Sequence, residues 1–143
     1  MNFVLDASVV LKWYVPEKSS DVAMRLKDQI EESSQLVAVP ESFFLESSNA
    51  LWKKSFLVKE LPSHDSKGIL SRILDLPFYV IKDEILLLKA LDLALVYGVS
   101  VYDGMYLACA LQSKAKLVTD DAALIRRLAN SEMSKWVMLL TDF

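Results

Sequence analysis

The sequence of 143 residues is poor in several residue types whose presence would point to particular protein classes. With a single cysteine, Cys109, the chain cannot form an internal disulfide, and a reducing compartment such as the cytoplasm fits. Three glycines and four prolines against 53% hydrophobic residues exclude a disordered or low-complexity chain. The longest leucine-rich stretch, residues 85–96, is short and interrupted by Lys89 and Asp92, so no membrane span is expected.

Positive charge and histidine are also scarce. The chain has 16 Lys and Arg against 19 Asp and Glu, a formal net charge of −3. Bulk charge therefore gives no attraction for nucleic acid, which would have to be drawn by local patches or metal ions. The single histidine, His64, stands between Ser63 and Asp65, but sequence neighbours on one helical turn rarely form a catalytic relay. The N-terminus lacks a basic segment before an apolar run, so no signal peptide is expected.

What is present is an alternation of helical patterns with short apolar runs. In residues 100–121, Asp103 precedes an apolar helical pattern, and the run Leu117–Val118 ends in Thr119-Asp120-Asp121. Comparable runs lie at residues 3–5, 36–39, 78–81 and 136–140, with about seven helices between the five. Short apolar strands that alternate with helices are typical of a parallel sheet buried on both faces. The sequence predicts one α/β domain, residues 1–143, with the first strand central and helices on both sides.

Three of the predicted helices carry patterns that the structure can test. The first, to about Ile30, is expected to be capped by Ser20. The second, residues 41–54, has a polar stripe and an apolar side expected to face the core. The stripe is Ser42, Glu46, Asn49 and Lys53, and the core-facing set is Phe44, Leu45, Leu51 and Trp52. The third, residues 84–97, is apolar enough for full burial or for a dimer interface.

Four acidic residues follow or open the predicted elements: Asp6, Glu46, Asp103 and Asp121. In parallel sheets the functional crevice lies beyond the carboxyl ends of the strands, where these side chains can meet. Clustered carboxylates repel one another unless a divalent cation neutralises them, and an all-oxygen ligand set suits Mg²⁺ or Mn²⁺. Ser8 and Thr119 offer hydroxyl groups to the same crevice.

Each of these residues also has a simpler interpretation. Asp6, Asp103 and Asp121 are all plausible helix N-caps, whereas Glu46 has no capping role and its stripe is the usual pattern of a solvated helix face. Five lysines are candidates to flank the crevice and hold phosphates, with ordinary solvated surface lysines as the alternative: Lys12, Lys53, Lys54, Lys114 and Lys116. Cys109 is expected to be a small core residue, and the three tryptophans core or interface residues rather than platforms for RNA bases.

Four stretches in order give the chain a family resemblance. They read FVLDASVVLKW at 3–13, VPESFFLESSNAL at 39–51, SVYDGMYLACAL at 100–111 and KLVTDDAAL at 116–124. The chain thereby resembles the PIN-domain family, specifically the VapC-type toxins of toxin–antitoxin pairs. The resemblance implies a three-layer α/β/α sandwich around a five-stranded parallel sheet. It also implies an Mg²⁺- or Mn²⁺-dependent endoribonuclease, usually a homodimer, inhibited by a protein antitoxin.

The family pattern maps onto individual residues of this chain. Its four acids correspond to Asp6, Glu46, Asp103 and Asp121, and its common Ser or Thr and Asn correspond to Ser8 and Asn49. Its last motif usually reads Thr-x-Asp, which favours Asp121 over Asp120 as the fourth acid, and Asp120 stays the alternative.

The resulting prediction is a metal-dependent endoribonuclease that acts on RNA in the cytoplasm. In-line attack of an activated water on the phosphodiester would leave a 5′-phosphate and a 3′-hydroxyl. The alternative is a PIN-like module that binds RNA or protein without significant cleavage. A phosphatase on another α/β fold fits less well, because Asp6-Ala7-Ser8 lacks the second acid of an Asp-x-Asp nucleophile motif.

Overall fold

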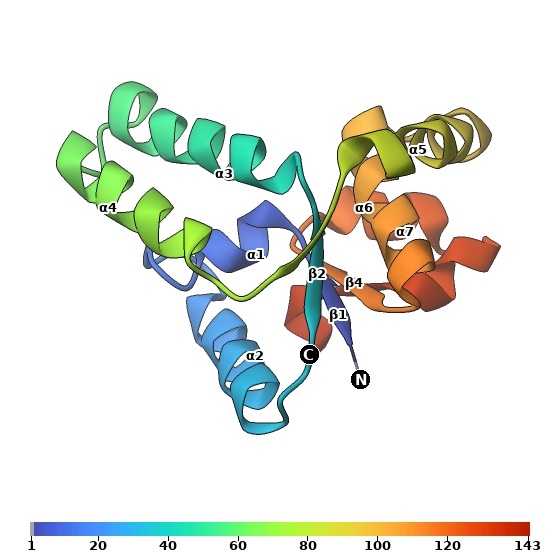
Figure 1. Ribbon diagram of the computed structural model, residues 1–143, viewed down its shortest axis with the longest axis horizontal. Helices are drawn as coiled ribbons and strands as arrows, with labels where there is room; N and C mark the ends of the chain where they lie inside the picture. Colours follow the sequence, from blue (N-terminus) through green and yellow to red (C-terminus); the bar gives the residue numbers. More distant parts are fainter. Residues whose placement is uncertain (1) are drawn as a thin grey trace.

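The computed structural model describes residues 2–143, in which five strands form one parallel sheet (Figure 1). The strands are β1 Phe3–Leu5, β2 Val37–Pro40, β3 Tyr79–Ile81, β4 Lys116–Thr119 and β5 Val137–Leu139. Their order is β3-β2-β1-β4-β5, and each neighbouring pair is parallel. The predicted central place of the first strand is confirmed.

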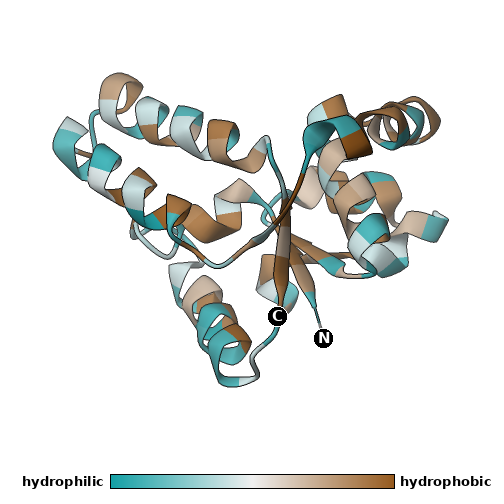
Figure 2. Cartoon of the chain, in the orientation of Figure 1, coloured by the Kyte–Doolittle hydropathy of each residue, from teal (hydrophilic) through white to brown (hydrophobic). Residues whose placement is uncertain are grey.

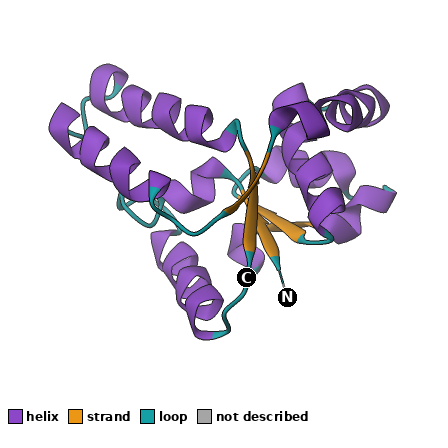
Figure 3. Ribbon diagram, viewed as in Figure 1, coloured by secondary structure: helices purple, strands orange, loops and turns teal. Residues whose placement is uncertain are grey.

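Helices cover both faces of this sheet. On one side lie α1 Ala7–Leu11, α2 Ser20–Glu32, α3 Phe43–Trp52 and α4 Ser63–Leu74, and on the other α5 Asp83–Tyr97, α6 Val101–Ser113 and α7 Ala122–Leu128. α3 continues into a π-helical turn, η1 Lys53–Leu57, and two 3₁₀ turns, η2 Glu132–Trp136 and η3 Leu140–Asp142, flank β5. Figure 3 shows the strands enclosed between the two helical layers. The predicted α/β/α sandwich is confirmed.

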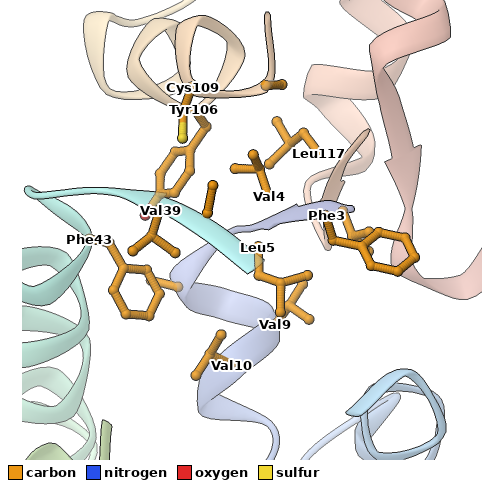
Figure 4. Packing of buried hydrophobic residues seen from close by; sticks show 14 of the residues in the cluster. Phe3, Val4, Leu5, Val9, Val10, Val39, Phe43, Tyr106, Cys109 and Leu117 are labelled. Atoms are coloured by element: carbon orange, nitrogen blue, oxygen red, sulfur yellow. The ribbon is translucent and has the colours of Figure 1, made fainter. Parts of the chain in front are cut away.

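The core is built on strands that are buried on both faces. All three residues of β1 are at most 2% exposed, which explains why this strand reads as a continuous apolar run. Figure 4 shows Val9 of α1 and Phe43 of α3 among the core residues on one side and Cys109 of α6 on the other. α6 is buried from Gly104 to Ala110 because it packs between the sheet and α5.

The face that α3 buries differs from the expected one. Phe43, Ser47 and Leu51 are buried, whereas Leu45 is 75% and Trp52 is 47% exposed, so the expectation that these two face the core is wrong. The four-residue spacing of the buried set defines one face of the helix. Ser47 can join it because its hydroxyl donates to the Phe43 carbonyl oxygen at 2.8 Å, which satisfies a buried polar group.

Two helix starts also differ from expectation. Ser19, in the left-handed conformation with φ of 67°, is the N-cap of α2, and Ser20 is its first helical residue. The hydroxyl of Ser20 instead accepts from the Glu17 N–H at 3.0 Å. At α6 the N-cap is Ser100, whose hydroxyl accepts from the Asp103 N–H at 3.1 Å. Asp103 is therefore not a cap but the third residue of the first turn.

The outer side of α5 remains apolar and exposed, so its full burial is excluded. Leu88 is 82% and Leu95 is 75% exposed, and Figure 2 shows most of this helix in brown. Among residues 2–143, none of the helices taken singly has the length and apolarity to cross a bilayer. α5 and α6 meet those criteria only as a pair, and they meet at an angle of 115°.

Candidate active site

The predicted acids reach one edge of the sheet because of the order of the elements. Asp6 directly follows β1, and its N–H donates to the Val118 carbonyl of the neighbouring β4 at 3.2 Å. Asp121 follows β4 at the same edge. α3 begins after β2, and α6 runs back toward the start of β4, so the first turns of both helices also lie there (Figure 1). These turns carry Glu46 and Asp103.

Asp6 is held from three sides. Its Oδ1 accepts from the Ser8 N–H at 3.2 Å, which makes it the N-cap of α1, and its Oδ2 accepts from the Thr119 hydroxyl at 2.7 Å. The Thr119 oxygen in turn accepts from the Asp121 N–H at 3.1 Å, so this fully buried threonine joins two of the acids. Burial raises the pKa of Asp6 above its ordinary value, although these hydrogen bonds oppose the shift.

Glu46 combines a raised pKa with a carboxylate oxygen that lacks a partner within residues 2–143. Burial raises the pKa of Glu46 to about 7, and the charges of Asp6 and Asp103 act in the same direction. The Tyr106 hydroxyl donates to Glu46 Oε2 at 3.1 Å and opposes this rise. Within residues 2–143, Glu46 Oε1 is buried without a hydrogen-bond partner. A buried carboxylate oxygen of this kind is costly unless a ligand satisfies it.

Asp103 and Asp121 differ in their local roles. Asp121 caps α7, since its Oδ1 accepts from the Leu124 N–H at 3.0 Å, whereas Asp103 has no capping role. Burial raises the pKa of Asp103, and the negative charges of Asp121 and Asp6 raise it further. The cap interpretation therefore describes Asp6 and Asp121 but leaves the positions of Glu46 and Asp103 unexplained.

The four acids are electrostatically coupled without forming a closed ligand set. Asp121 raises the pKa of Asp6, and Asp6 and Asp103 raise the pKa of Glu46. In the described part of the chain, however, no three acidic side chains converge closely enough to hold a metal ion as they stand. Repulsion between carboxylates favours such separation, and a cation would draw the side chains together.

The donor chemistry of the crevice fits a hard divalent cation. The candidate ligands are oxygen atoms only, as Mg²⁺ and Mn²⁺ prefer. Two of the oxygens, Glu46 Oε1 and Ser8 Oγ, are buried without a partner within residues 2–143. These orphaned atoms are the kind that a bound ion or its water shell would satisfy.

Comparison with known proteins identifies the family. The sequence model of the PIN domain matches residues 3–130. The chain belongs to the PIN-domain family. Ribonuclease VapC3 of Pyrobaculum aerophilum is 33% identical over 132 residues, which cover 89% of this chain and 95% of the relative.

Solved structures share the fold along nearly the whole chain. PAE2754 from Pyrobaculum aerophilum aligns with a TM-score of 0.71 at 21% identity, covering 99% of this chain and 85% of that one. VapBC2 from Rickettsia felis, solved bound to a DNA fragment of its promoter, aligns with a TM-score of 0.65 at 14% identity, covering 97% and 98%. At these identities the likeness establishes the PIN-like fold alone.

In this PIN domain, the two candidates for the fourth acid point to different partners. Asp120 forms an ion pair with the ammonium of Lys12 at 3.1 Å, and Lys12 also pairs with Glu17 at 3.0 Å. Lys12 is only 6% exposed, so this ammonium is committed to the two carboxylates. Asp121, by contrast, acts on the pKa values of Asp6 and Asp103. Asp120 is thus tied to Lys12, and Asp121 stays the predicted fourth acid.

The other candidates have clear positions. The side chain of His64 is 86% exposed at the start of α4, and among residues 2–143 its one ion-pair partner is Asp65, at 3.1 Å. Cys109 is buried in α6, and burial raises the pKa of its thiol to about 12, so it is no nucleophile. Asn49 lies on α3 at the rim of a hollow beside Glu46.

Sequence reasoning missed Tyr106, which orients Glu46. Its side chain is 3% exposed and reaches from α6 to α3. The spacing in the sequence could have indicated it, because Tyr106 follows Asp103 by one helical turn and therefore lies on the same side of α6. The partner of its hydroxyl could not be read from the sequence, since α3 and α6 are far apart in the chain.

Proposed function

We propose that this PIN-domain chain is a divalent-cation-dependent endoribonuclease, acting in the cytoplasm as the toxin of a toxin–antitoxin pair. The observation that carries the proposal is Glu46, an acid with a pKa of about 7 and an unpartnered oxygen among three further coupled carboxylates. Perturbed groups of this kind concentrate at functional sites. The relative named Ribonuclease VapC3, which matches along most of both chains, supports the choice of RNA as substrate.

In this proposal Asp6, Glu46, Asp103 and Asp121 hold Mg²⁺ or Mn²⁺ at the carboxyl edge of the sheet. A bound cation would neutralise the cluster and polarise the scissile phosphate. Thr119 keeps the Asp6 carboxylate in place, and Tyr106 fixes one oxygen of Glu46. The other oxygen, Oε1, would hold the cation through the attacking water and would take a proton from that water. The water oxygen bonds to phosphorus, the bond to the 3′ oxygen breaks, and the 3′ oxygen takes a proton from solvent, so that the products carry a 5′-phosphate and a 3′-hydroxyl.

Cleavage of end-labelled RNA tests the proposal directly. We expect cleavage with Mg²⁺ or Mn²⁺ and none in EDTA. Glu46→Gln should reduce the rate about 100-fold or more, because it removes the proton acceptor. Glu32→Gln is the matched control, since Glu32 is exposed at the end of α2 and lies toward the opposite edge of the sheet. Equal cleavage with and without chelator would refute the metal-dependent mechanism.

One observation favours the alternative, a PIN-like module that binds RNA or protein without significant cleavage. In residues 2–143 no three acids converge as a ready ligand set. If that arrangement persists with metal, the protein would bind RNA and leave it intact. The same assay separates the two functions, because the alternative predicts intact RNA with Mn²⁺ present.

The proposed partners are a protein antitoxin and a second copy of the chain. Neighbours in fold include proteins solved as toxin–antitoxin complexes, such as one from Klebsiella pneumoniae, with a TM-score of 0.61. The exposed apolar side of α5 is the surface that we assign to the second copy, because an apolar helix face can pack against itself around a two-fold axis.

A further inference from the structure

A hollow of about 570 Å³ lies directly beside Glu46. Its wall on α3 is formed by the polar stripe of that helix, and its other wall by the first turn of α6. The lining residues are Ser42, Leu45, Glu46, Asn49, Ala50, Lys53 and Tyr102. Because Glu46 belongs both to the hollow and to the acid cluster, a molecule bound in the hollow would reach the proposed reaction centre.

Polar groups in the hollow lack partners within the protein. Ser42 Oγ, like Glu46 Oε1, is buried with no hydrogen-bond partner among residues 2–143. Lys53 takes part in none of the ion pairs within this part of the chain. Its neighbour Lys54, in contrast, pairs with Glu17 at 2.7 Å and with Glu60 at 3.2 Å. Within residues 2–143, Lys53 therefore lines the hollow with a charge that no ion pair neutralises.

The hollow also presents exposed apolar surface suited to a flat ring. Tyr102 is 69% exposed and Leu45 is 75% exposed, on opposite walls. An exposed aromatic ring and an unpaired ammonium that line one hollow are the combination with which proteins hold single-stranded nucleic acid, the ring stacking on a base and the cation contacting a phosphate.

We propose that this hollow binds the nucleotide adjacent to the cleaved phosphodiester in single-stranded RNA. The base stacks on Tyr102, its edge faces the amide of Asn49 and the hydroxyl of Ser42, and Lys53 contacts the neighbouring phosphate. This inference rests on the proposed function and adds to it the path that the RNA strand takes along α3. It also accounts for the polar stripe, which otherwise reads as an ordinary solvated face.

The chain offers a matched control for each key residue. Tyr79, on the edge strand β3, is 64% exposed but lies outside the hollow, so Tyr79→Ala controls for Tyr102→Ala. Lys54→Met controls for Lys53→Met, because it removes a neighbouring charge that is already paired. The assays are fluorescence anisotropy of a labelled single-stranded RNA in EDTA, and cleavage kinetics of the same RNA with Mn²⁺.

We expect Tyr102→Ala to weaken binding about tenfold or more and to raise KM with kcat little changed. Lys53→Met should weaken binding and reduce the slope of log affinity against log salt by about 1. Both controls should match wild type, and all four variants should melt within a few degrees of it.

Two outcomes would overturn the inference, and they differ from failure of the nuclease itself. If RNA is cleaved but Tyr102→Ala and Lys53→Met match their controls, the hollow is not the nucleotide site. If Tyr102→Ala instead converts a dimer to a monomer in sedimentation, the hollow is an interface between copies. If RNA binding depends on Tyr102 and Lys53 but no cleavage occurs with Mn²⁺, the hollow is a nucleotide site, whereas the nuclease function and the place of this nucleotide beside a cleaved bond are refuted.

Discussion

At the scale of single residues, burial and mutual repulsion raise the pKa values of three of the four acids, so these acids hold their protons more tightly than in the unfolded chain. Glu46, Asp6 and Asp103 all have a pKa raised chiefly by burial and further by one another or by Asp121. A folded state that holds protons more tightly than the unfolded chain gains stability as the pH falls. For Glu46 this gain is complete below its ordinary pKa of 4.5 and is lost as the pH rises through about 7.

The free energy of unfolding of the metal-free protein should therefore increase as the pH falls from about 8 to about 5. The measurement is the melting temperature in EDTA across this range. Glu46→Gln should flatten much of the dependence, because the amide cannot titrate. A wild-type protein whose melting temperature falls on acidification through this range would contradict the electrostatic account.

The two neighbouring aspartates should respond differently to the same substitution. Asp121→Asn should impair RNA cleavage strongly while leaving α7 intact, because Asn caps a helix about as well as Asp. Asp120→Asn should retain most activity and lose about 1 kcal/mol of stability, since Lys12 keeps its bond to Glu17. Cleavage rates and melting curves of the two variants measure this, and the reverse ranking of rates would transfer the fourth acid to Asp120.

At the scale of elements, the position of Asp103 depends on how closely α6 approaches α5. A Cβ on Gly104 would collide with the carbonyl oxygen of Ala90 in α5. Gly104→Ala should therefore cost about 1–3 kcal/mol of unfolding free energy by forcing the two helices apart.

Gly68→Ala in α4 is the matched control for this change. No atom lies within 4 Å of the Cβ that it would introduce, so the better helix propensity of alanine should add about 0.5–1 kcal/mol. Urea unfolding of both variants measures the two effects. Equal stabilisation by the two substitutions would show that the helices are not in close contact at Gly104.

The arrangement of elements was largely predictable, whereas side-chain partnerships across elements were not. The short apolar runs identified the buried strands, and parallel pairing placed Asp6 and Asp121 at one edge. Asp103 is a plausible cap of α6 by sequence, but the cap is Ser100, three residues earlier, which is an equally good capping residue. The ion pair of Lys12 with Asp120 joins the end of α1 to the turn after β4. No residue pattern near either partner predicts this contact.

At the scale of the whole molecule, the exposed side of α5 is the surface that we propose for contact with a second copy. Leu88 and Leu95 are the most exposed apolar residues of this helix, two turns apart on one face. We expect the wild-type protein to sediment as a dimer and the Leu88→Glu, Leu95→Glu double variant as a monomer. Leu74→Glu, at the exposed end of α4 in the other helical layer, should leave the dimer intact. A monomeric wild type at micromolar concentration would refute this assignment.

The central claim is that the acid cluster binds a divalent cation, and thermal melting of Asp103→Asn with and without Mn²⁺ tests it most directly. The matched control is Asp65→Asn, because Asp65 is likewise the third residue of its helix, α4, but lies outside the cluster. Both variants lose the same favourable interaction with the helix dipole. In EDTA, Asp103→Asn should melt at or above Asp65→Asn, since only the former relieves repulsion from Asp6 and Asp121.

With Mn²⁺ at one hundred times its Kd, wild type and Asp65→Asn should each gain about 2.7 kcal/mol of stability. Asp103→Asn should gain far less, because it lacks one of the proposed ligands. A wild-type protein that shows no shift with Mn²⁺, or an Asp103→Asn variant that gains as much as Asp65→Asn, would contradict the account.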